Sequence, residues 1–357
     1  MGRFPVTTQE QATAIVEKII CYAQNNDTTL SSWRNTMTFI ADDEDSNMHF
    51  HQAEELCDIV GSQYPVFNVN KIYLDAYQLV KTPSGARYPA VNVAINQAIA
   101  NGSLILNYTG HGGEDGWSGE KVLTIPDIED WSNAGRLPVF ITATCEFSRF
   151  DNPERFSAGE MVIVKPNAGA IALYTTTRLA LAMSNFKLDT SFFRNLMNKD
   201  TNGQYLKMGD LLRISKNNNS NSNSIRNFVL LGDPAQTIAF PALNVVTTEI
   251  NNHPVGPLPD TLLGLSVVQV KGEVRDAAGN KMTGFNGNLF SKVFDKPVTY
   301  RTLGNQPKSY KEFFQLQNVV LSEGRDTVNQ GDFTFSFIVP EDISPPFGFG
   351  KISYYAS

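Results

Sequence analysis

A histidine and a cysteine stand at the ends of two apolar runs in this sequence. The run Ser103 to Tyr108 leads into "TGHGG", which places His111 among glycines, and the run "PVFITAT" ends at Cys145. A cysteine nucleophile needs a base to raise its thiolate fraction, and imidazole is the usual partner. The two residues are 34 positions apart, about one strand–helix–strand crossover, and consecutive parallel strands are usually neighbours. We therefore expect His111 and Cys145 at the same sheet edge, as base and nucleophile of one site.

Two further groups would complete such a site. The backbone N–H groups of Gly112 and Cys145 could form an oxyanion hole, in which a lost donor typically costs a few kcal/mol. An acidic run, 42 to 45, follows an earlier apolar strand and could orient the imidazole through Asp42, Asp43 or Glu44. Each motif alone has a plainer interpretation, as a glycine turn, a core cysteine or a solvated loop tip. Only their joint placement at strand ends favours catalysis.

The remaining histidines and cysteines predict neither a metal site nor a disulfide framework. Cys21 and Cys57 lie in apolar helical contexts, which favours core packing. No CxxC pair or His/Cys cluster has the spacing of a zinc site. His49 and His51 could form a metal pair, but no third ligand spacing supports it, so helix-start or surface positions are favoured. No cofactor is expected, and a structural calcium ion is not readable from the sequence.

Composition indicates a globular protein and argues against two classes of partner. The chain has 357 residues, of which 41% are hydrophobic and 18% charged, with a net charge of -7 and a pI of about 5.2. No Lys/Arg-rich run is present, so we expect no nucleic-acid or anionic-membrane partner. No stretch approaches the roughly 18 apolar residues of a membrane span. The opening residues "MGRFPVTTQE" show no charged-then-apolar leader.

Strands and helices alternate over the first two thirds of the chain. Each expected strand is a continuous apolar run, which is typical of a mostly parallel sheet covered by helices on both faces. The expected strands are 37–41, 71–74, 103–108, 138–144, 169–174 and "FVLLGDP", and the expected helices are 7–25, 52–62, 91–100, 126–134, 156–165, 187–199 and 205–217. The low-complexity run 217–225 is interpreted as a surface loop.

The pattern changes after Pro241. Runs such as "LSVVQVKGEV" and "GDFTFSFIVP" alternate apolar with polar residues and are separated by turn signals, which predicts an all-β, Ig-like sandwich. Four prolines mark a linker within 241–260. We expect an α/β domain over 1–243 and a β-sandwich over 244–357. Because the chain opens at a candidate strand and ends in mid-strand pattern, we also expect a fragment, with N-terminal residues missing and the sandwich truncated.

The motifs resemble the gingipain-type cysteine peptidases, which have a caspase-like fold. The resemblance covers residues 1–243 and rests on "SLILNYTGHGGEDGW", "LPVFITATCEFSRFD", "GAIALYTTTR" and "VLLGDPA". It implies that Cys145 is the nucleophile and His111 the general base and acid. It places the third catalytic carboxylate on Asp43 or Glu44. The loop Thr175 to Arg178, with Thr176, would line the primary specificity pocket, and Trp117 could either wall the cleft or pack in the core.

One departure from this family concerns specificity. Arginine-specific gingipains carry an aspartate at the pocket floor, where this chain reads "NMHF" and places Asn47. A buried Arg or Lys side chain of a substrate would lack its charged partner there. We therefore expect no trypsin-like specificity.

A narrower resemblance is to the sortases of the type IX secretion system of Bacteroidetes. It rests on "GRFPV", "FIADDEDSNMHFHQAEEL" and the trailing "FNGNLFSKVFDK", "FTFSFIVPEDI" and "GKISYYA". It implies cleavage before the C-terminal signal domain of secreted cargo through a thioester on Cys145. Water would give a peptidase, and an amine on surface lipopolysaccharide would give a transpeptidase. The implied location is the outer face of the outer membrane, among other surface proteins of the secretion system.

Two other functions remain open at this point. One is a general gingipain-like endopeptidase, which strong turnover of peptides with basic P1 residues would favour. The other is a non-catalytic caspase-like scaffold that carries a β-sandwich adhesion module. The presence of both His111 and Cys145 weighs against the scaffold.

Overall fold

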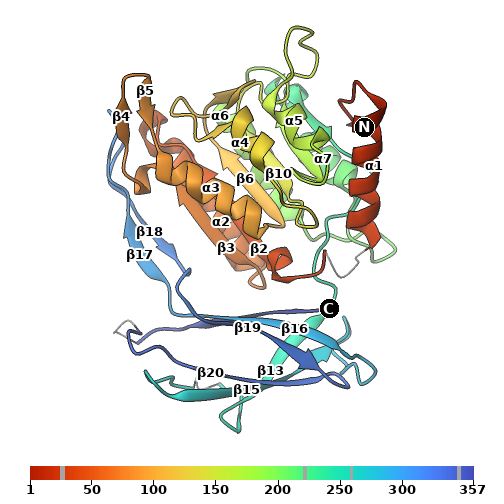
Figure 1. Ribbon diagram of the computed structural model, residues 1–357, viewed down its shortest axis with the longest axis vertical. Coiled ribbons are helices and arrows are strands. Elements are labelled where there is room, and N and C mark those ends of the chain that lie inside the picture. The colour runs from red at the N-terminus through yellow and green to blue at the C-terminus, as the bar shows by residue number, and fades with distance from the viewer. Residues whose placement is uncertain (25–28, 220–222, 258–259, 344–346) are drawn as a thin grey trace. The chain divides into compact units, whose positions relative to one another are not determined.

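The computed structural model describes residues 1–24, 29–219, 223–257, 260–343 and 347–357 (Figure 1). Parts of the predicted loop 217–225 and of the predicted linker 241–260 therefore lie outside the described residues. Residue contacts divide the chain into two compact units, each of which we describe by itself. The first comprises Met1–Thr29, Thr36–Ala239 and Tyr300–Phe314, and the second comprises Leu30–Asn35, Phe240–Thr299 and Gln315–Ser357. The domain boundary at 243/244 stays a prediction. The division into units differs from it by grouping Tyr300–Phe314 with the first unit, by grouping Leu30–Asn35 with the second, and by starting the main part of the second unit at Phe240.

The first unit is built on a seven-stranded sheet of order β1-β12-β11-β10-β6-β2-β3. Its strands are β1 (Gly2–Arg3), β2 (Thr36–Ala41), β3 (Asn68–Tyr73), β6 (Ile105–Thr109), β10 (Val139–Ala143), β11 (Ala172–Thr176) and β12 (Phe228–Leu231). All neighbours pair in parallel except β11 and β12, which are antiparallel. Every residue of β6, β10 and β11 is buried, as a sheet covered on both faces requires. The predicted mostly parallel α/β architecture is confirmed.

Helices cover both faces of this sheet (Figure 1). On one face the apolar side chains of four helices join the strand residues Ile40, Leu106 and Phe140 in one core. These helices are α1 (Gln9–Gln24), α3 (Pro89–Asn101), α4 (Ile125–Asp130) and α5 (Ala158–Val164). The opposite face is covered by α2 (Met48–Gln63), α6 (Ala182–Asn195) and α7 (Met208–Asn217), where Phe39 of β2 packs against Phe193 of α6.

Local sequence explains where several of these helices begin. Pro89 opens α3 in the first turn, where its missing N–H costs nothing. Thr124 with Asp127 forms a capping box at the start of α4, and Ser157 with Glu160 forms one at the start of α5. In each box the two side chains accept hydrogen bonds from each other's backbone N–H groups in the first turn. The short helical turns are η1 (Ser32–Asn35), η2 (Asp45–Asn47), η3 (Leu74–Ala76) and η4 (Asn223–Asn227).

Two small sheets in the first unit were not predicted. The expected loop around Pro83 and Gly85 contains a hairpin of β4 (Val80–Thr82) and β5 (Gly85–Arg87). The glycine-rich stretch after β6 forms a three-stranded sheet of β7 (Gly112–Gly113), β8 (Gly116–Trp117) and β9 (Leu123–Thr124). These strands are two or three residues long, too short for an alternating pattern to show.

The second unit is a β-sandwich. Its two sheets have the orders β14-β13-β15-β20 and β19-β16-β21, and every described pairing is antiparallel. Alternate residues of β15 and β20 are buried and meet Leu289 and Val293 of β16 in one core. Its strands are β13 (Asn244–Ile250), β14 (His253–Pro254), β15 (Val267–Arg275), β16 (Gly287–Phe294), β19 (Val320–Val328), β20 (Asp332–Ile338) and β21 (Lys351–Ala356). The hairpin strands β17 (Val298–Arg301) and β18 (Phe313–Leu316) pair only with each other among the described residues.

Among the described residues, no helix has the length and apolar character that crossing a membrane would need.

Candidate active site

Adjacent strand ends bring the histidine and cysteine loops into contact. β6 and β10 pair in parallel with Thr109 opposite Ala143, so the residues that follow both strands leave the sheet at one edge. His111 lies two residues beyond β6, and Cys145 two residues beyond β10. Gly112 lies directly against Thr144, because a Cβ atom built on Gly112 would be 2.6 Å from Thr144 Oγ1. His111 and Cys145, the predicted base and nucleophile, therefore each neighbour a residue at which the two loops touch.

The backbone of His111 is held on both sides. Its N–H donates to Asp42 Oδ2 at 2.8 Å, and its carbonyl oxygen accepts from the Tyr108 hydroxyl at 2.6 Å. Gly110 allows this close approach, since a Cβ there would lie 2.4 Å from the Asp42 Cβ. Both glycines of "GHG" thus have a packing reason, and the position of the imidazole is set by β2 and β6 together.

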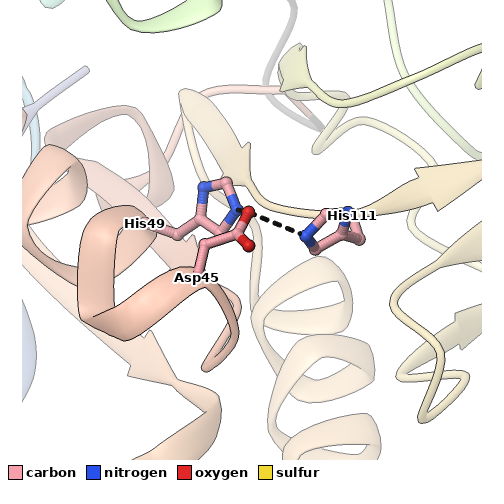
Figure 2. A group of neighbouring side chains, drawn as sticks. All are labelled: Asp45, His49 and His111. Atoms are coloured by element: carbon pink, nitrogen blue, oxygen red, sulfur yellow. Dashed lines mark hydrogen bonds and ion pairs between the residues drawn. The ribbon is translucent and has the colours of Figure 1, made fainter. Parts of the chain in front are cut away.

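Carboxylates of the acidic loop face the imidazole. His111 Nε2 lies 3.0 Å from Asp45 Oδ2 (Figure 2). It also lies 3.5 Å from Glu44 Oε2. Nε2 is thereby occupied, which leaves Nδ1 as the nitrogen available to a thiol. Asp45 and the two residues after it have positive φ angles of 55°, 58° and 64°, and this left-handed turn directs the loop back toward His111.

Asp43, a predicted orienting residue, lies elsewhere in the loop. Its Oδ2 accepts from the Tyr88 hydroxyl at 2.5 Å, and it is buried. Burial raises the pKa of Asp43 to about 6, and the Tyr88 hydrogen bond opposes that rise. Burial also raises the pKa of Asp42 well above its usual range, against the lowering effect of the His111 N–H. Of the two carboxylates assigned from the sequence, the structure brings Glu44 to the imidazole and places Asp43 against Tyr88.

The loop of Cys145 is anchored by the neighbouring strand β11. The Thr176 hydroxyl donates to the Thr144 carbonyl at 2.5 Å, immediately before the cysteine. The half-buried Cys145 sulfur accepts from the Ala180 N–H at 3.4 Å and lies 3.5 Å from the Ala180 carbonyl oxygen. Ala180 was missed from the sequence because a backbone donor has no side-chain signature.

The predicted specificity loop divides into buried and exposed residues. Thr175 and Thr176 are fully buried, and the Thr175 hydroxyl bonds that of Ser148 at 2.9 Å. Arg178 is exposed and forms a bidentate ion pair with Asp151. The two threonines are therefore core residues beside the cysteine loop, and Arg178 is paired with Asp151 at the surface.

Asn47 and Trp117 are both committed to internal contacts. The Asn47 amide donates to the Tyr310 carbonyl at 2.6 Å and accepts from the Tyr310 N–H at 2.8 Å. Ser309 of the same segment donates to the Asp43 carbonyl at 2.6 Å. Trp117 is fully buried and stacks on Tyr108 with ring centroids 4.4 Å apart. Asn47 thus joins the acidic loop to the segment Tyr300–Phe314. Trp117 packs in the core and is also among the residues that line the cavity beside His111.

The other histidines and cysteines of the first unit differ in burial. His49 lies in the first turn of α2 but is buried, with its ring edge-on to His111 at a centroid distance of 5.4 Å. His51, two residues on, is exposed and lies 3.5 Å from Glu312. Cys57 is buried, and burial raises the pKa of its thiol to about 12, whereas Cys21 is half-buried. Burial also lowers the pKa of His49 to about 4, so this imidazole is neutral.

A cavity of about 690 Å³ opens beside the histidine. Its lining begins at His111 and Gly112 and continues through the β7–β9 sheet to Pro126. A pocket of this size suits several residues of an extended peptide or a small ligand. A thiol with an N–H beside it, an imidazole whose Nε2 faces carboxylates, and a cavity next to that imidazole are features of a cysteine peptidase site on an α/β sheet.

The comparisons with known proteins agree with this class. The model of peptidase family C25 matches residues 1–239, so the chain belongs to that family and is a gingipain-like cysteine peptidase. No curated protein matches the sequence.

Solved structures show the same fold. The Arg-specific cysteine proteinase gingipain R (RgpB) is 15% identical, with a TM-score of 0.55 over 95% of this chain and 74% of its own. The complex of Porphyromonas gingivalis RgpB pro- and mature domains is 15% identical, with a TM-score of 0.53 over 95% and 76%. Dimeric latent PorU from Porphyromonas gingivalis is 27% identical over 54% of this chain and 18% of its own, but its TM-score of 0.32 is too low to support an argument.

Proposed function

We propose that this protein is a sortase-type cysteine peptidase that removes the C-terminal signal domain from type IX secretion cargo at the surface of a Bacteroidetes cell. The observation that carries the peptidase chemistry is the contact of Gly112 with Thr144, which joins the His111 and Cys145 loops. The secretion role, the cargo and the cell-surface location are supported by the sequence resemblance alone. Lipopolysaccharide and other surface proteins of the secretion system are the further partners that this role implies.

The reaction proceeds through a thioester. His111 takes the proton of the Cys145 thiol, and the thiolate attacks the carbonyl carbon before the signal domain. The C–N bond then breaks as the imidazolium returns the proton to the leaving amine. Water, or an amine of a surface sugar, attacks the thioester carbonyl carbon while His111 accepts its proton. The C–S bond then breaks, and the imidazolium returns that proton to the departing Cys145 thiolate. The carboxylates of Glu44 and Asp45 stabilise the imidazolium that forms between these steps.

Specificity should favour uncharged P1 side chains. Asn47 is neutral, and its amide is used by the Tyr310 backbone. The nearby threonines Thr175 and Thr176 are neutral and buried as well. Asn47 and these threonines offer a basic P1 side chain no carboxylate, and burying an unpaired charge is costly. Strong turnover of basic P1 peptides would therefore favour a general gingipain-like endopeptidase instead.

The test uses the full chain and a reporter protein that carries a C-terminal signal domain. Cys145→Ala should abolish cleavage and retain the fold, whereas Cys21→Ala, at a half-buried thiol on α1, serves as the matched control and should cleave normally. Mass spectrometry with an added amino sugar distinguishes an amide product from the free acid. Unaltered cleavage by Cys145→Ala would end the proposal. Absence of acylation at Cys145 by a thiol-directed probe would favour the scaffold.

A further inference from the structure

We propose that Asp45, His49 and His111 form a Zn²⁺ site that reversibly blocks the catalytic imidazole. Its inhibitory effect rests on the proposed peptidase function, but binding of the ion does not. Asp45 Oδ2 lies between the two histidines, 3.0 Å from His111 Nε2 and 3.5 Å from His49 Nε2 (Figure 2). One donor atom from each residue lies within 4.8 Å of the others.

This arrangement is close to what zinc requires. Zinc binds imidazole nitrogen and carboxylate oxygen at about 2.0–2.2 Å in a tetrahedron, so its ligand atoms lie about 3.3 Å apart. The two distances to Asp45 bracket that value. The planes of the two imidazole rings are nearly perpendicular, with an angle of 89° between them. Two rings at this angle can bind one ion without stacking on each other. Two nitrogen donors favour zinc over calcium or magnesium, which select oxygen.

His49 supplies an independent indication of a ligand. Its exposed fraction is only 3%, and neither ring nitrogen makes a hydrogen bond within the part of the chain that the structure describes. Buried polar groups are normally paired, and an unpaired one calls for an explanation such as an ion or water. The imidazole faces Asp45 and His111, the two groups with which it would share a metal. An ion there would give His49 Nε2 a direct bond where it now has only the long contact of 3.5 Å with Asp45.

Solvent can reach this position from one side. The side chains of Asp45 and His111 are each nearly half exposed, while His49 closes the inner side. Glu44 Oε2, 3.5 Å from His111 Nε2, is available as the fourth ligand or as the acceptor of a hydrogen bond from a bound water. The carboxylates of Asp45 and Glu44 together supply two negative charges, which match the charge of Zn²⁺.

Zinc on His111 Nε2 would stop catalysis by fixing the tautomer. The ring proton of a neutral imidazole bound through Nε2 must sit on Nδ1, the nitrogen that is left for the Cys145 thiol. His111 could then no longer accept the thiol proton. Asp45 would bind the ion and would no longer pair with the imidazole. Removal of the ion restores both, so the inhibition is reversible by a chelator.

The binding test uses the full chain with Cys145→Ala, which removes the thiolate as a competing ligand. Zinc affinity is measured against a chromophoric chelator, and Co²⁺ is used to report tetrahedral geometry from its visible spectrum. We expect one ion per chain. His49→Gln and His49→Phe should each weaken zinc binding on the order of tenfold or more, because each removes one of three ligands. His51→Gln, on the same helix but exposed, is the matched control and should bind as the parent does.

Three results would overturn the proposal. The first is equal zinc affinity in the His49 variants and in His51→Gln. The second is binding that is lost in Cys145→Ala relative to the wild type, which would place the ion on the thiolate. The third is tight zinc binding that leaves probe acylation of wild-type Cys145 unchanged. Zinc binding in a protein whose Cys145 never acylates would instead refute the proposed function and leave the metal site standing.

Discussion

Gly112→Ala tests whether the contact between the two catalytic loops sets the reaction rate. A Cβ at this position would lie 2.6 Å from Thr144 Oγ1 and 2.9 Å from the Gly116 carbonyl oxygen. Ordinary contact begins at 3.4 Å, so the loops must separate by about 0.8 Å. A misplacement of about 1 Å can reduce a catalytic rate about a hundredfold, or about 2.7 kcal/mol. We expect kcat/KM to fall by that order, with a loss of stability of about 1–3 kcal/mol.

The same loop provides the control and a rescue. Gly113→Ala adds the same methyl group where nothing lies within 4 Å, so it should leave the spacing of the two loops unchanged and lower the rate much less. Thr144→Ala removes the hydroxyl that Gly112→Ala would strike, and that hydroxyl has no hydrogen-bond partner among the described residues. The double variant should recover part of the lost rate, since the Gly116 contact remains. The assay is the rate of Cys145 acylation by a thiol-directed probe, followed by reporter cleavage. Equal rates for Gly112→Ala and Gly113→Ala would refute the reasoning.

Three further predictions concern the residues around this contact. Asp45→Asn should lower kcat/KM about tenfold or more by weakening support for the imidazolium, and more than Asp43→Asn does; a larger effect at Asp43 in reporter cleavage would reverse the assignment. Asn47→Ala should lower the free energy of unfolding by about 1–3 kcal/mol, because it leaves the Tyr310 N–H and carbonyl unpaired; an unchanged urea midpoint would contradict this. Burial raises the pKa of Asp189 to about 7, so the folded state binds an extra proton between the unfolded pKa and pH 7, and stability falls as pH rises through that window. Asp189→Asn should therefore stabilise the protein at about pH 8 relative to about pH 5 by an amount on the order of a few kcal/mol, measured by urea unfolding, and a constant difference would count against it.

The sequence predicted the central pair because parallel-sheet geometry is local and regular. Apolar runs that end at His111 and Cys145 place both residues at the carboxyl edge, and adjacency of β6 and β10 follows from a single crossover. The expected helices agree with the observed ones to within five residues at each end. Each helix buries one face, and its apolar residues therefore recur at helical spacing in the sequence. The antiparallel direction of β12 could not be predicted, because a buried apolar strand has the same sequence pattern in a parallel and in an antiparallel pair.

The orienting carboxylate could not be fixed from the sequence. The run 42–45 offers four acidic residues, and the choice among them depends on three successive left-handed residues that begin at Asp45. Such a turn is compatible with Asp, Ser and Asn but is not dictated by them. Asn47 was assigned to a pocket, yet its partner Tyr310 lies 263 residues away in the chain, beyond the reach of any local pattern. The contact of the buried His49 with His111 could not be predicted either, because no residue next to His49 in the sequence points to it.

The central claim is that Cys145 is the nucleophile and His111 its base. The most direct measurement is peptide mapping by mass spectrometry after the full chain reacts with an acylating probe built on a signal-domain cleavage sequence. The account predicts a single adduct on Cys145, formed about a hundredfold or more slowly in His111→Ala. An adduct on Cys21 or Cys57 in place of Cys145, or acylation of Cys145 at an equal rate without the imidazole, would contradict it.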